Sequence, residues 1–253
     1  MAGHSKWANI KHRKGAQDKK RSKQFTKVLK EISVAIKENN NNGDPDTNPA
    51  LRNALVNARG VNLPKENIER AIKKATGADA DNYEYMSFEG YGPHGIAFFI
   101  ECMTNNTNRS VANVRAIFNK NNGSLSTNGS VEFLFERNGV FTINKAGLTT
   151  DLEELQLELI EAGATSFDDE DGIFTIYTAF QDFGAMSAKL EALGIEVQQA
   201  DLQRIPLDTK VLPLEAAKDI LKLIDAFEDD DDVQNIFHNL ELTDELVEHL
   251  ESS

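Results

Sequence analysis

The most constraining feature of this sequence is the order in which strand and helix patterns alternate between residues 139 and 205. The patterns predict, in order, a strand at 140–144, a helix at 151–162, strands at 164–168 and 172–178, a helix at 180–193 and a strand at 195–204. This βαββαβ order is that of the ferredoxin-like, or split-βαβ, fold. We therefore predict a ferredoxin-like α+β domain over residues 139–205.

The segments on either side of it, residues 78–138 and 206–253, carry the patterns of a second α+β domain. Two strand-like runs in "YMSFEGYGPHGIAFFIECMT" are joined by a Gly-Pro turn, and "NRSVANVRAIFNKN" reads as a helix. A helix at 214–227 and a second helix at 233–240 are predicted near the C-terminus. We expect this C-terminal segment to return and complete the middle domain, so that the ferredoxin-like domain is an insertion in it.

The first 77 residues predict a small basic helical domain. Phe25, Val28, Leu29, Ile32 and Ile36 recur at the spacing of one helix face. Asn48-Pro49 is a typical start for a second helix, which we expect to end at Gly60. A third helix is predicted between Pro64 and Gly77. The chain as a whole is therefore expected to be a multidomain α+β protein with domains at 1–77, at 78–138 plus 206–253, and at 139–205.

Charge is divided unevenly along the chain. Residues 1–30 carry ten Lys and Arg residues and one acid, a net charge of +9, although the whole protein carries −14. Residues 1–76 carry 17 basic and 7 acidic side chains, and residues 77–253 carry 10 basic and 34 acidic ones. The two nets, +10 and −24, are typical of a nucleic-acid-facing segment attached to a body that repels nucleic acid.

The basic segment combines cations with aromatic rings. Lys20, Lys23, Lys27 and Lys30 share an arc of about 80° on the first helix, nearly opposite its apolar face, and we expect this lysine row to face outward. Trp7 and His12 are suited to stacking on bases, which favours unpaired RNA over duplex DNA. The candidate nucleic-acid contacts are Lys6, Trp7, Lys11, His12, Arg13, Lys14, Lys19, Lys20, Arg21, Lys23, Lys27 and Lys30.

The sequence carries no complete motif of catalysis or cofactor binding. "GYGPHG" at 90–95 matches G-x-G-x-x-G, but a β-type run follows it where a dinucleotide site needs a helix, so we predict a turn. The acidic runs at 168–171 and 228–232 lack the spacing of a calcium loop and are interpreted as solvated turns and helix caps. The five histidines lack metal-binding spacing. We therefore expect no cofactor, no metal and no enzymatic activity.

Other features bear on the compartment. No apolar run approaches the length of a membrane span, and the N-terminus has no secretory apolar region. The only cysteine, Cys102, lies in an apolar run and is predicted to be buried. The basic, acid-poor start also resembles a mitochondrial transit peptide, but it is rich in Lys rather than Arg. We expect a cytoplasmic protein without a membrane partner.

Three stretches resemble the YebC/PmpR family over essentially the whole chain: "MAGHSKWANIKHRKGAQDKKRSKQFTKVLKEI", "FEGYGPHGIAFFIECMTNNTNRSVANVRAIFNKNNGSL" and "GSVEFLFERNGV". Bacterial members are described as probable transcriptional regulators, and a mitochondrial relative is the translational activator of cytochrome c oxidase. The resemblance implies three domains and a cytoplasmic, non-enzymatic protein. It marks Gly3, His4, Ser5, Lys6, Trp7, Ile10, Lys11, Arg13 and Lys14 as contact residues. Family members often have Gly at the position of His94.

Two functions remain open. The first is DNA binding that regulates transcription, although no convincing helix-turn-helix is present and the third helix has a mixed face of Lys65, Glu66, Asn67, Glu69 and Arg70. The second is association with ribosomal RNA, helping translation through difficult stretches such as consecutive prolines. In either case we expect a monomer that binds nucleic acid, or the ribosome, through its basic N-terminal domain.

Overall fold

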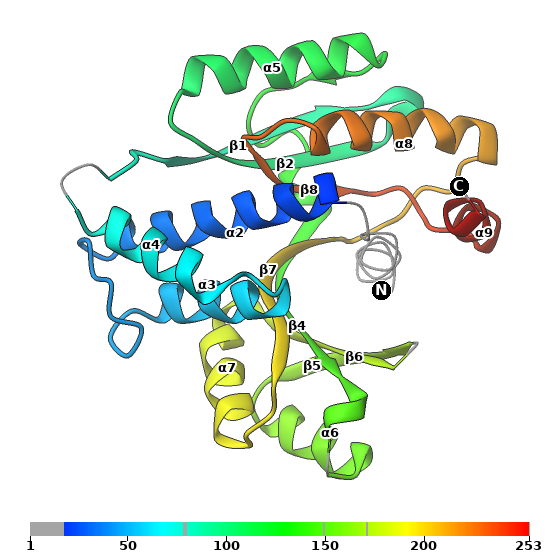
Figure 1. The fold of residues 1–253 in the computed structure, drawn as a ribbon. Coiled ribbons are helices and arrows are strands. Elements are labelled where there is room, and N and C mark those ends of the chain that lie inside the picture. The colour runs from blue at the N-terminus through cyan, green and yellow to red at the C-terminus, as the bar shows by residue number, and fades with distance from the viewer. Residues whose placement is uncertain (1–17, 78–79, 149, 171, 253) are drawn as a thin grey trace. The chain divides into compact units, whose positions relative to one another are not determined.

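The computed structural model describes residues 18–77, 80–148, 150–170 and 172–252 (Figure 1). The chain divides into two compact units. The first consists of the residues up to Lys30, Asp81–Glu136 and Ile205–Ser253, and the second of Glu31–Ala80 and Arg137–Arg204. Within the described ranges, no helix is both long enough and apolar enough to span a membrane.

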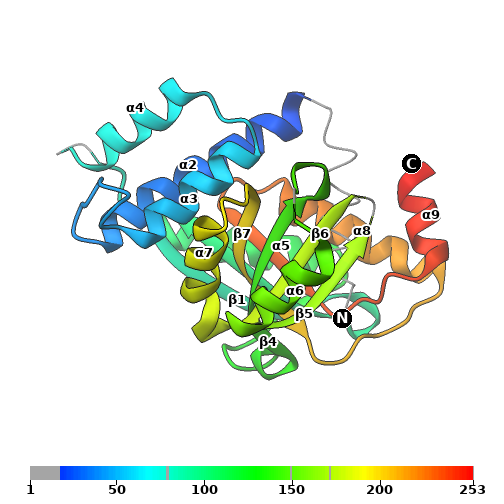
Figure 2. The same cartoon turned by 90° about the horizontal axis from the view of Figure 1, so that it is seen from below.

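The second unit contains the predicted ferredoxin-like fold. Its elements are β4 (Phe135–Asn144), α6 (Leu152–Glu161), β5 (Ala164–Glu170), β6 (Ile173–Ala179), α7 (Phe183–Ala192) and β7 (Val197–Pro206). The sheet order β5-β6-β4-β7 places the hairpin strand β6 beside β4, as this fold requires. Helices α6 and α7 cover the sheet (Figure 2) and bury Leu155, Leu159, Met186 and Leu190 against its strands. The βαββαβ prediction is confirmed.

The first unit is built on a second four-stranded sheet, ordered β3-β1-β2-β8. Its strands are β1 (Glu84–Tyr91), β2 (Ala97–Thr104), β3 (Ser124–Leu125) and β8 (Val233–His238). Since β8 follows the whole second unit in sequence and pairs antiparallel with β2, the ferredoxin-like unit is an insertion, as predicted. The predicted helix at 233–240 is wrong. A short apolar run is ambiguous by itself, and here the free edge of β2 makes it a strand, with Phe237 opposite Phe99.

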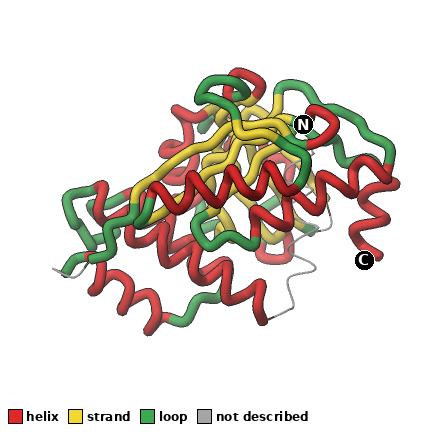
Figure 3. The backbone as a smooth tube through the Cα atoms, turned by 90° about the horizontal axis from the view of Figure 1, so that it is seen from above, coloured by secondary structure: helices red, strands yellow, loops and turns green. Residues whose placement is uncertain are grey.

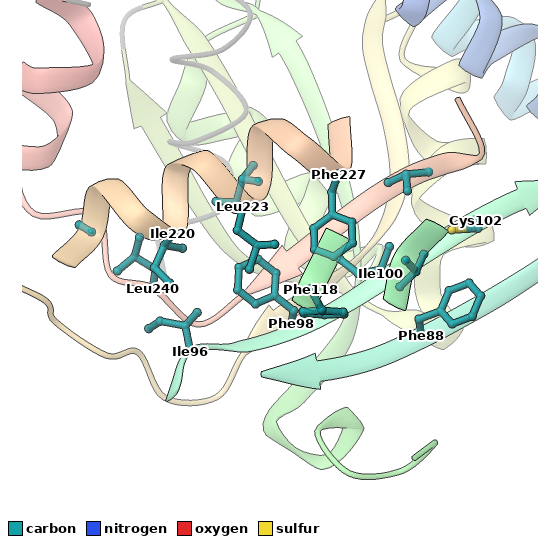
Figure 4. Close-up of a cluster of buried hydrophobic side chains, with 14 of the residues drawn as sticks. Phe88, Ile96, Phe98, Ile100, Cys102, Phe118, Ile220, Leu223, Phe227 and Leu240 are labelled. Atoms are coloured by element: carbon teal, nitrogen blue, oxygen red, sulfur yellow. The ribbon is translucent and has the colours of Figure 1, made fainter. Parts of the chain in front are cut away.

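Two helices cover one face of this sheet, α5 (Thr107–Lys120) and α8 (Leu214–Glu228). In the view from above, α5 runs across the strands (Figure 3). The core between the helices and the sheet is centred on three phenylalanines (Figure 4). The ring of Phe98 lies 6.1 Å from that of Phe118, and Phe118 lies 4.9 Å from Phe227, both close to the edge-to-face geometry that aromatic pairs favour. A final helix, α9 (Asp244–Ser252), was not predicted.

The "GYGPHG" stretch is a turn, as predicted. It connects β1 to β2 through a single 3₁₀ turn, η1 (Pro93–Gly95), and a strand rather than a helix follows. A Cβ on Gly90 would lie 2.5 Å from the carbonyl oxygen of Ser124, so close packing requires this glycine. His94 has a φ of 59°, in the left-handed region that glycine adopts more readily. Its side chain lies beside α8, with Nε2 3.4 Å from Oδ2 of Asp219.

Three helices account for the described part of residues 1–77: α2 (Asp18–Glu38), α3 (Pro49–Gly60) and α4 (Lys65–Ala75). The predicted start of α3 is correct, because Asn48 Oδ1 accepts a hydrogen bond of 3.1 Å from the Leu51 N–H. The left-handed residue after α3 is Asn62 rather than Gly60. Contacts divide these helices between the two units after Lys30, so a separate domain over 1–77 stays a prediction.

Gly60 is required for close packing of α3 against β7 rather than for a left-handed helix end. A Cβ at this position would lie 1.9 Å from the carbonyl oxygen of Gln198 in β7, far inside van der Waals contact. Beside it, Asn57 connects α3 to the same strand. Its Oδ1 accepts the Ala200 N–H at 2.9 Å, and its Nδ2 donates to Asp201 Oδ1 at 2.8 Å. The second unit therefore includes α3 as a packed layer against the ferredoxin-like sheet.

Candidate nucleic-acid interface

The structure describes four of the twelve predicted contact side chains. Lys6, Trp7, Lys11, His12, Arg13 and Lys14 lie outside the described residues, and Lys19 and Lys20 belong to α2 without described side chains. Arg21 is exposed on α2, with its guanidinium carbon 5.4 Å from the centre of the Phe25 ring. The remaining three, Lys23, Lys27 and Lys30, all contact other parts of the first unit.

The lysine row of α2 lies against the segment that leads into β8. Lys23 forms an ion pair with Asp229, and Lys27 Nζ donates to the Gln234 carbonyl oxygen at 2.9 Å. Lys30 is only 6% exposed and donates to the carbonyl oxygens of Met103 at 3.1 Å and Asp231 at 2.5 Å. The expectation that the row faces outward is therefore wrong for Lys23, Lys27 and, most clearly, Lys30, and Lys20 has no described side chain.

A buried carboxylate explains why the chain accepts the Lys30 ammonium in its interior. Asp232 Oδ1 lies 3.3 Å from Lys30 Nζ, and both side chains are almost fully buried. A buried cation is costly unless it is paired and hydrogen-bonded, and Lys30 has both kinds of partner. The acidic run at 228–232 was predicted to be solvated, and this is wrong for its last residue: Asp229 and Asp231 are exposed, but Asp232 is buried.

The other partners of Asp232 come from the start of α5 and the end of β2. Arg109 Nη2 and Nε lie 2.7 and 3.1 Å from Asp232 Oδ2. Ser110 Oγ and Thr104 Oγ1 donate to the same oxygen at 2.9 and 3.0 Å. Burial opposes ionisation of Asp232, but the hydrogen bonds from Arg109, Ser110 and Thr104 outweigh it, and the pKa of this carboxyl is lowered.

These contacts define what we call the Asp232 cluster: Lys30, Thr104, Arg109, Ser110 and Asp232. The cluster was not predicted, although each of the two segments that form it has a recognisable sequence pattern. The polar run "TNNTNRS" directly follows an apolar strand, and the acidic run directly precedes another. Because β2 and β8 are neighbours in the sheet, the two runs meet at one end of it. The pKa of Arg109 is raised by its hydrogen bond to Asp232, so this guanidinium is always charged.

Helix α4 carries exposed cations in the second unit. Lys65, Arg70 and Lys73 are exposed, and Glu66 and Glu69 are exposed between them. Lys65 Nζ lies 3.7 Å from Glu69 Oε1, one turn along the helix. The mixed face expected from the sequence is therefore present. Lys74 is also exposed, so α4 carries four cations and two acids, a net charge of +2.

A cavity of about 310 Å³ lies in the second unit between α3, α7 and β7. Its ionisable lining groups are Arg52, Arg59, Glu191 and Glu196, and Arg52 lies 3.8 Å from Glu191. Ser187, the one hydroxyl in the lining, is within 3.4 Å of the Asn53 side chain. Among the described residues that line this cavity there is no histidine or cysteine, so a nucleophile paired with a base is not assembled there.

The fold defines a class of multidomain α+β proteins in which a ferredoxin-like unit interrupts a second four-stranded sheet. The profile described as "TACO1/YebC protein N-terminal domain" matches residues 5–78, and that described as "TACO1/YebC second and third domain" matches residues 83–240. The chain belongs to the TACO1/YebC family.

Several relatives are similar over nearly their whole length. A "Probable transcriptional regulatory protein" of Amoebophilus asiaticus is 50% identical over 242 residues, which cover 95% of this chain and 98% of the relative. The "Probable transcriptional regulatory protein GK2594" of Geobacillus kaustophilus is 49% identical with the same coverage. The crystal structure of the conserved hypothetical protein Aq1575 of Aquifex aeolicus is similar with a TM-score of 0.79 at 35% identity, covering 90% of this chain and 93% of that one.

Proposed function

We propose that this protein is a non-enzymatic, cytoplasmic DNA-binding regulator of transcription that grips the DNA backbone with its basic N-terminal segment. The observation that carries the proposal is the division of charge, +10 over residues 1–76 against −24 over residues 77–253. Lysine and arginine side chains that neutralise phosphates release condensed counterions, which supplies most of the affinity for duplex DNA. The names of the relatives from Amoebophilus and Geobacillus support a role in transcription.

The proposed set of contact residues is smaller than the set expected from the sequence. Lys30 is removed from the proposed set because its ammonium is buried in the Asp232 cluster. Lys23 and Lys27 have partners within the first unit, so they contribute to DNA binding only by exchanging those partners for phosphates. The proposed grip is therefore centred on the residues from Lys6 to Arg21. Acidic surfaces in the remainder of the chain, such as the exposed side of α8, disfavour non-specific contacts with DNA.

A salt titration tests the proposed phosphate contacts of the basic N-terminal segment. Fluorescence anisotropy of labelled duplex DNA would be measured over a range of salt for the full chain and for a variant with Lys11, Arg13, Lys14, Lys19, Lys20 and Arg21 changed to Gln. We expect the slope of log K against log salt to shrink by about 0.9 per lost phosphate contact. The control variant Lys65→Gln with Lys73→Gln removes two exposed cations of α4 that lie outside the proposed contact residues, and it should bind like the wild type.

The regulatory part of the proposal needs a preferred sequence. Selection from random duplexes should return a site bound at least roughly 10³-fold more tightly than random DNA. Equal affinity for all duplexes would contradict a role in transcription, and no binding to duplex DNA would contradict the proposal altogether.

A second candidate function is an RNA-binding factor that acts on the ribosome. It is favoured by Trp7 and His12, whose rings among the cations are suited to unpaired bases. Gradient sedimentation of cell lysate at low salt, with and without RNase, distinguishes the two. Co-migration with ribosomal subunits that RNase abolishes would support translation, whereas recovery on discrete chromosomal sites supports the regulator.

A further inference from the structure

Helix α5 has an outer face without negative charge, unlike the neighbouring helix α8. Residues 102–131 contain no Asp or Glu, although the chain has 41 acidic residues. In Figure 1 the helix lies at the top of the drawing, and in Figure 3 it crosses in front of the strands. The exposed residues share one side of the helix by their spacing, and they form what we call the α5 outer face: Asn108, Ala112, Arg115, Ala116, Asn119 and Lys120.

The two cations of this face, Arg115 and Lys120, differ from the other cations of the two surrounding segments. Within the described part of the chain they form no ion pair and no side-chain hydrogen bond. Asp81–Glu136 and Ile205–Ser253 together contain six Lys and Arg residues. Four of them bond to a carboxylate or a carbonyl: Arg109 to Asp232, Lys210 to the His94 carbonyl, Lys218 to Glu215 and Lys222 to Asp219. In the described ranges, Arg115 and Lys120 are exposed and form neither kind of contact.

The amide side chains and the small side chains of the face, like its two cations, suit contact with a phosphate backbone. Asn108 and Asn119 are exposed, and within the described part of the chain their side chains make no hydrogen bond, so they remain available as donors. Ala112 and Ala116 lie between the polar residues and leave room for a close approach. Phosphate oxygens of a nucleic-acid backbone accept hydrogen bonds from Asn as well as from Arg and Lys.

The neighbouring helix sets a boundary to this surface. The exposed side of α8 carries Glu215, Asp219 and Asp225, and the whole helix has four acids against Lys218 and Lys222, a net charge of −2. A polyanion is attracted by α5 and repelled by α8, so charge complementarity restricts it to the α5 side of the helical layer. A negatively charged partner is thus favoured over an acidic or neutral protein surface.

The helix that carries this face also shares a buried carboxylate with the basic helix α2. Arg109 in the first turn of α5 and Lys30 in α2 bind the same buried carboxylate, that of Asp232. Both helices therefore belong to one polar cluster, and a nucleic acid held at the basic N-terminal segment is at high effective concentration for a second contact.

We propose that the α5 outer face is a second DNA-contact surface, on which Arg115 and Lys120 bind backbone phosphates and Asn108 and Asn119 donate hydrogen bonds to phosphate or sugar oxygens of the same duplex. The two cations are five positions apart, which is roughly 7.5 Å along the helix axis and so about two nucleotide steps of duplex DNA. This inference rests on the proposed function, because two cations alone supply too few phosphate contacts for stable binding.

The test compares two double variants of the full chain on the same random-sequence duplex. Arg115→Gln with Lys120→Gln should reduce the slope of log K against log salt by about 1.8 and the affinity at 0.1 M salt by about 60-fold, the value for two lost phosphate contacts. The matched control, Lys218→Gln with Lys222→Gln, removes two cations from α8 and should leave both quantities unchanged. All four positions lie outside the core, and thermal melting checks that each variant is folded.

A cross-linking experiment places the DNA directly. A photoactivatable reagent attached to Asn119→Cys on α5 should cross-link to duplex DNA, while the same reagent on Asp225→Cys on α8 should not. Cys102 is buried and does not compete for the label. A wild-type chain that binds no duplex DNA overturns both this inference and the proposed function. A wild-type chain that binds, with a slope that the α5 variant does not change, overturns this inference alone, and so does an α5 effect confined to single-stranded RNA.

Discussion

Lys30 Nζ lies 3.3 Å from Asp232 Oδ1 in the interior of the first unit, so a residue of the basic helix is held by a residue of the acidic run. Asp232→Ala leaves the Lys30 ammonium without its carboxylate, and we expect a loss of about 3–5 kcal/mol in the free energy of unfolding. Lys30→Met should cost less, about 1.5–3 kcal/mol, because Asp232 keeps Arg109, Ser110 and Thr104.

Urea denaturation measures both losses. The control Lys73→Met removes an exposed cation of α4 and should change stability by less than about 0.5 kcal/mol. Equal stability of wild type and Asp232→Ala would contradict a stabilising role of the cluster.

The lowered pKa of Asp232 predicts how stability depends on pH. The folded-state pKa is below the unfolded value of about 3.9, so the contribution is complete above that value and is lost as the pH falls through the folded pKa. Wild type should lose stability faster than Asp232→Asn on acidification below about pH 4. The comparison isolates this residue, since Asp219 and Glu215 also have lowered pKa values in both proteins. Parallel pH profiles for the two proteins would refute the assignment.

Removal of the Phe98 ring should destabilise the first unit strongly. Phe98 is fully buried and its ring packs against those of Phe118 and Phe227. Phe98→Ala leaves a cavity and should cost about 3–5 kcal/mol. Phe133, which is 66% exposed, is the matched control, and Phe133→Ala should change the denaturation midpoint little. Similar midpoints for the two variants would contradict the packing described for this core.

Two glycines should respond in opposite ways to alanine. Gly60→Ala places a Cβ 1.9 Å from the Gln198 carbonyl oxygen, so α3 and β7 must separate, at a cost of about 1–3 kcal/mol. Gly184→Ala, in α7, meets no atom within 4 Å and should stabilise the helix by up to about 1 kcal/mol. Thermal melting shows whether each variant is more or less stable than the wild type. An unchanged melting temperature of Gly60→Ala would show that α3 and β7 pack less closely than described.

The Cys102 thiol should resist modification in the folded protein. Burial, together with the nearby Asp230 and Asp232, raises its pKa to about 12, so the reactive thiolate is scarce at neutral pH. Iodoacetamide should modify it only after unfolding in denaturant. Rapid alkylation of the native protein would show that the strand β2 opens more readily than its burial indicates.

The sequence predicted the order of elements in the second unit well because each strand and helix there has its own periodicity. It did not distinguish strand from helix at Val233–His238, where a short apolar run fits both and the exposed edge of β2 decides. Helical spacing correctly placed Val28, Ile32 and Ile36 on a buried face. It also placed Lys30 on the opposite face, but spacing does not reveal what a second element will place there, and here the Asp231–Asp232 segment covers it.

The candidate site was predictable only in part for a related reason. The net charge of the N-terminal segment is a local property that counting reveals. The Asp232 cluster joins residues more than 100 positions apart, and such pairs require knowledge of the sheet order. The α5 outer face was predictable in part: its helix could be read from the sequence, but the meaning of its charge could not. The sequence predicted the helix, and the structure buries Val114 and Phe118 on its inner side. The absence of acids on its other side becomes meaningful only beside the acidic α8.

The position of β8 also has a consequence for biosynthesis. This strand begins 129 residues after β2 ends, so the ribosome makes the entire ferredoxin-like unit before the neighbour of β2 exists. At about 5–20 residues per second, β2 waits roughly 6–26 s with an open edge. An unpaired edge of this kind is where nascent chains associate wrongly. The inserted unit can therefore fold first, while the sheet that precedes it in the message closes last.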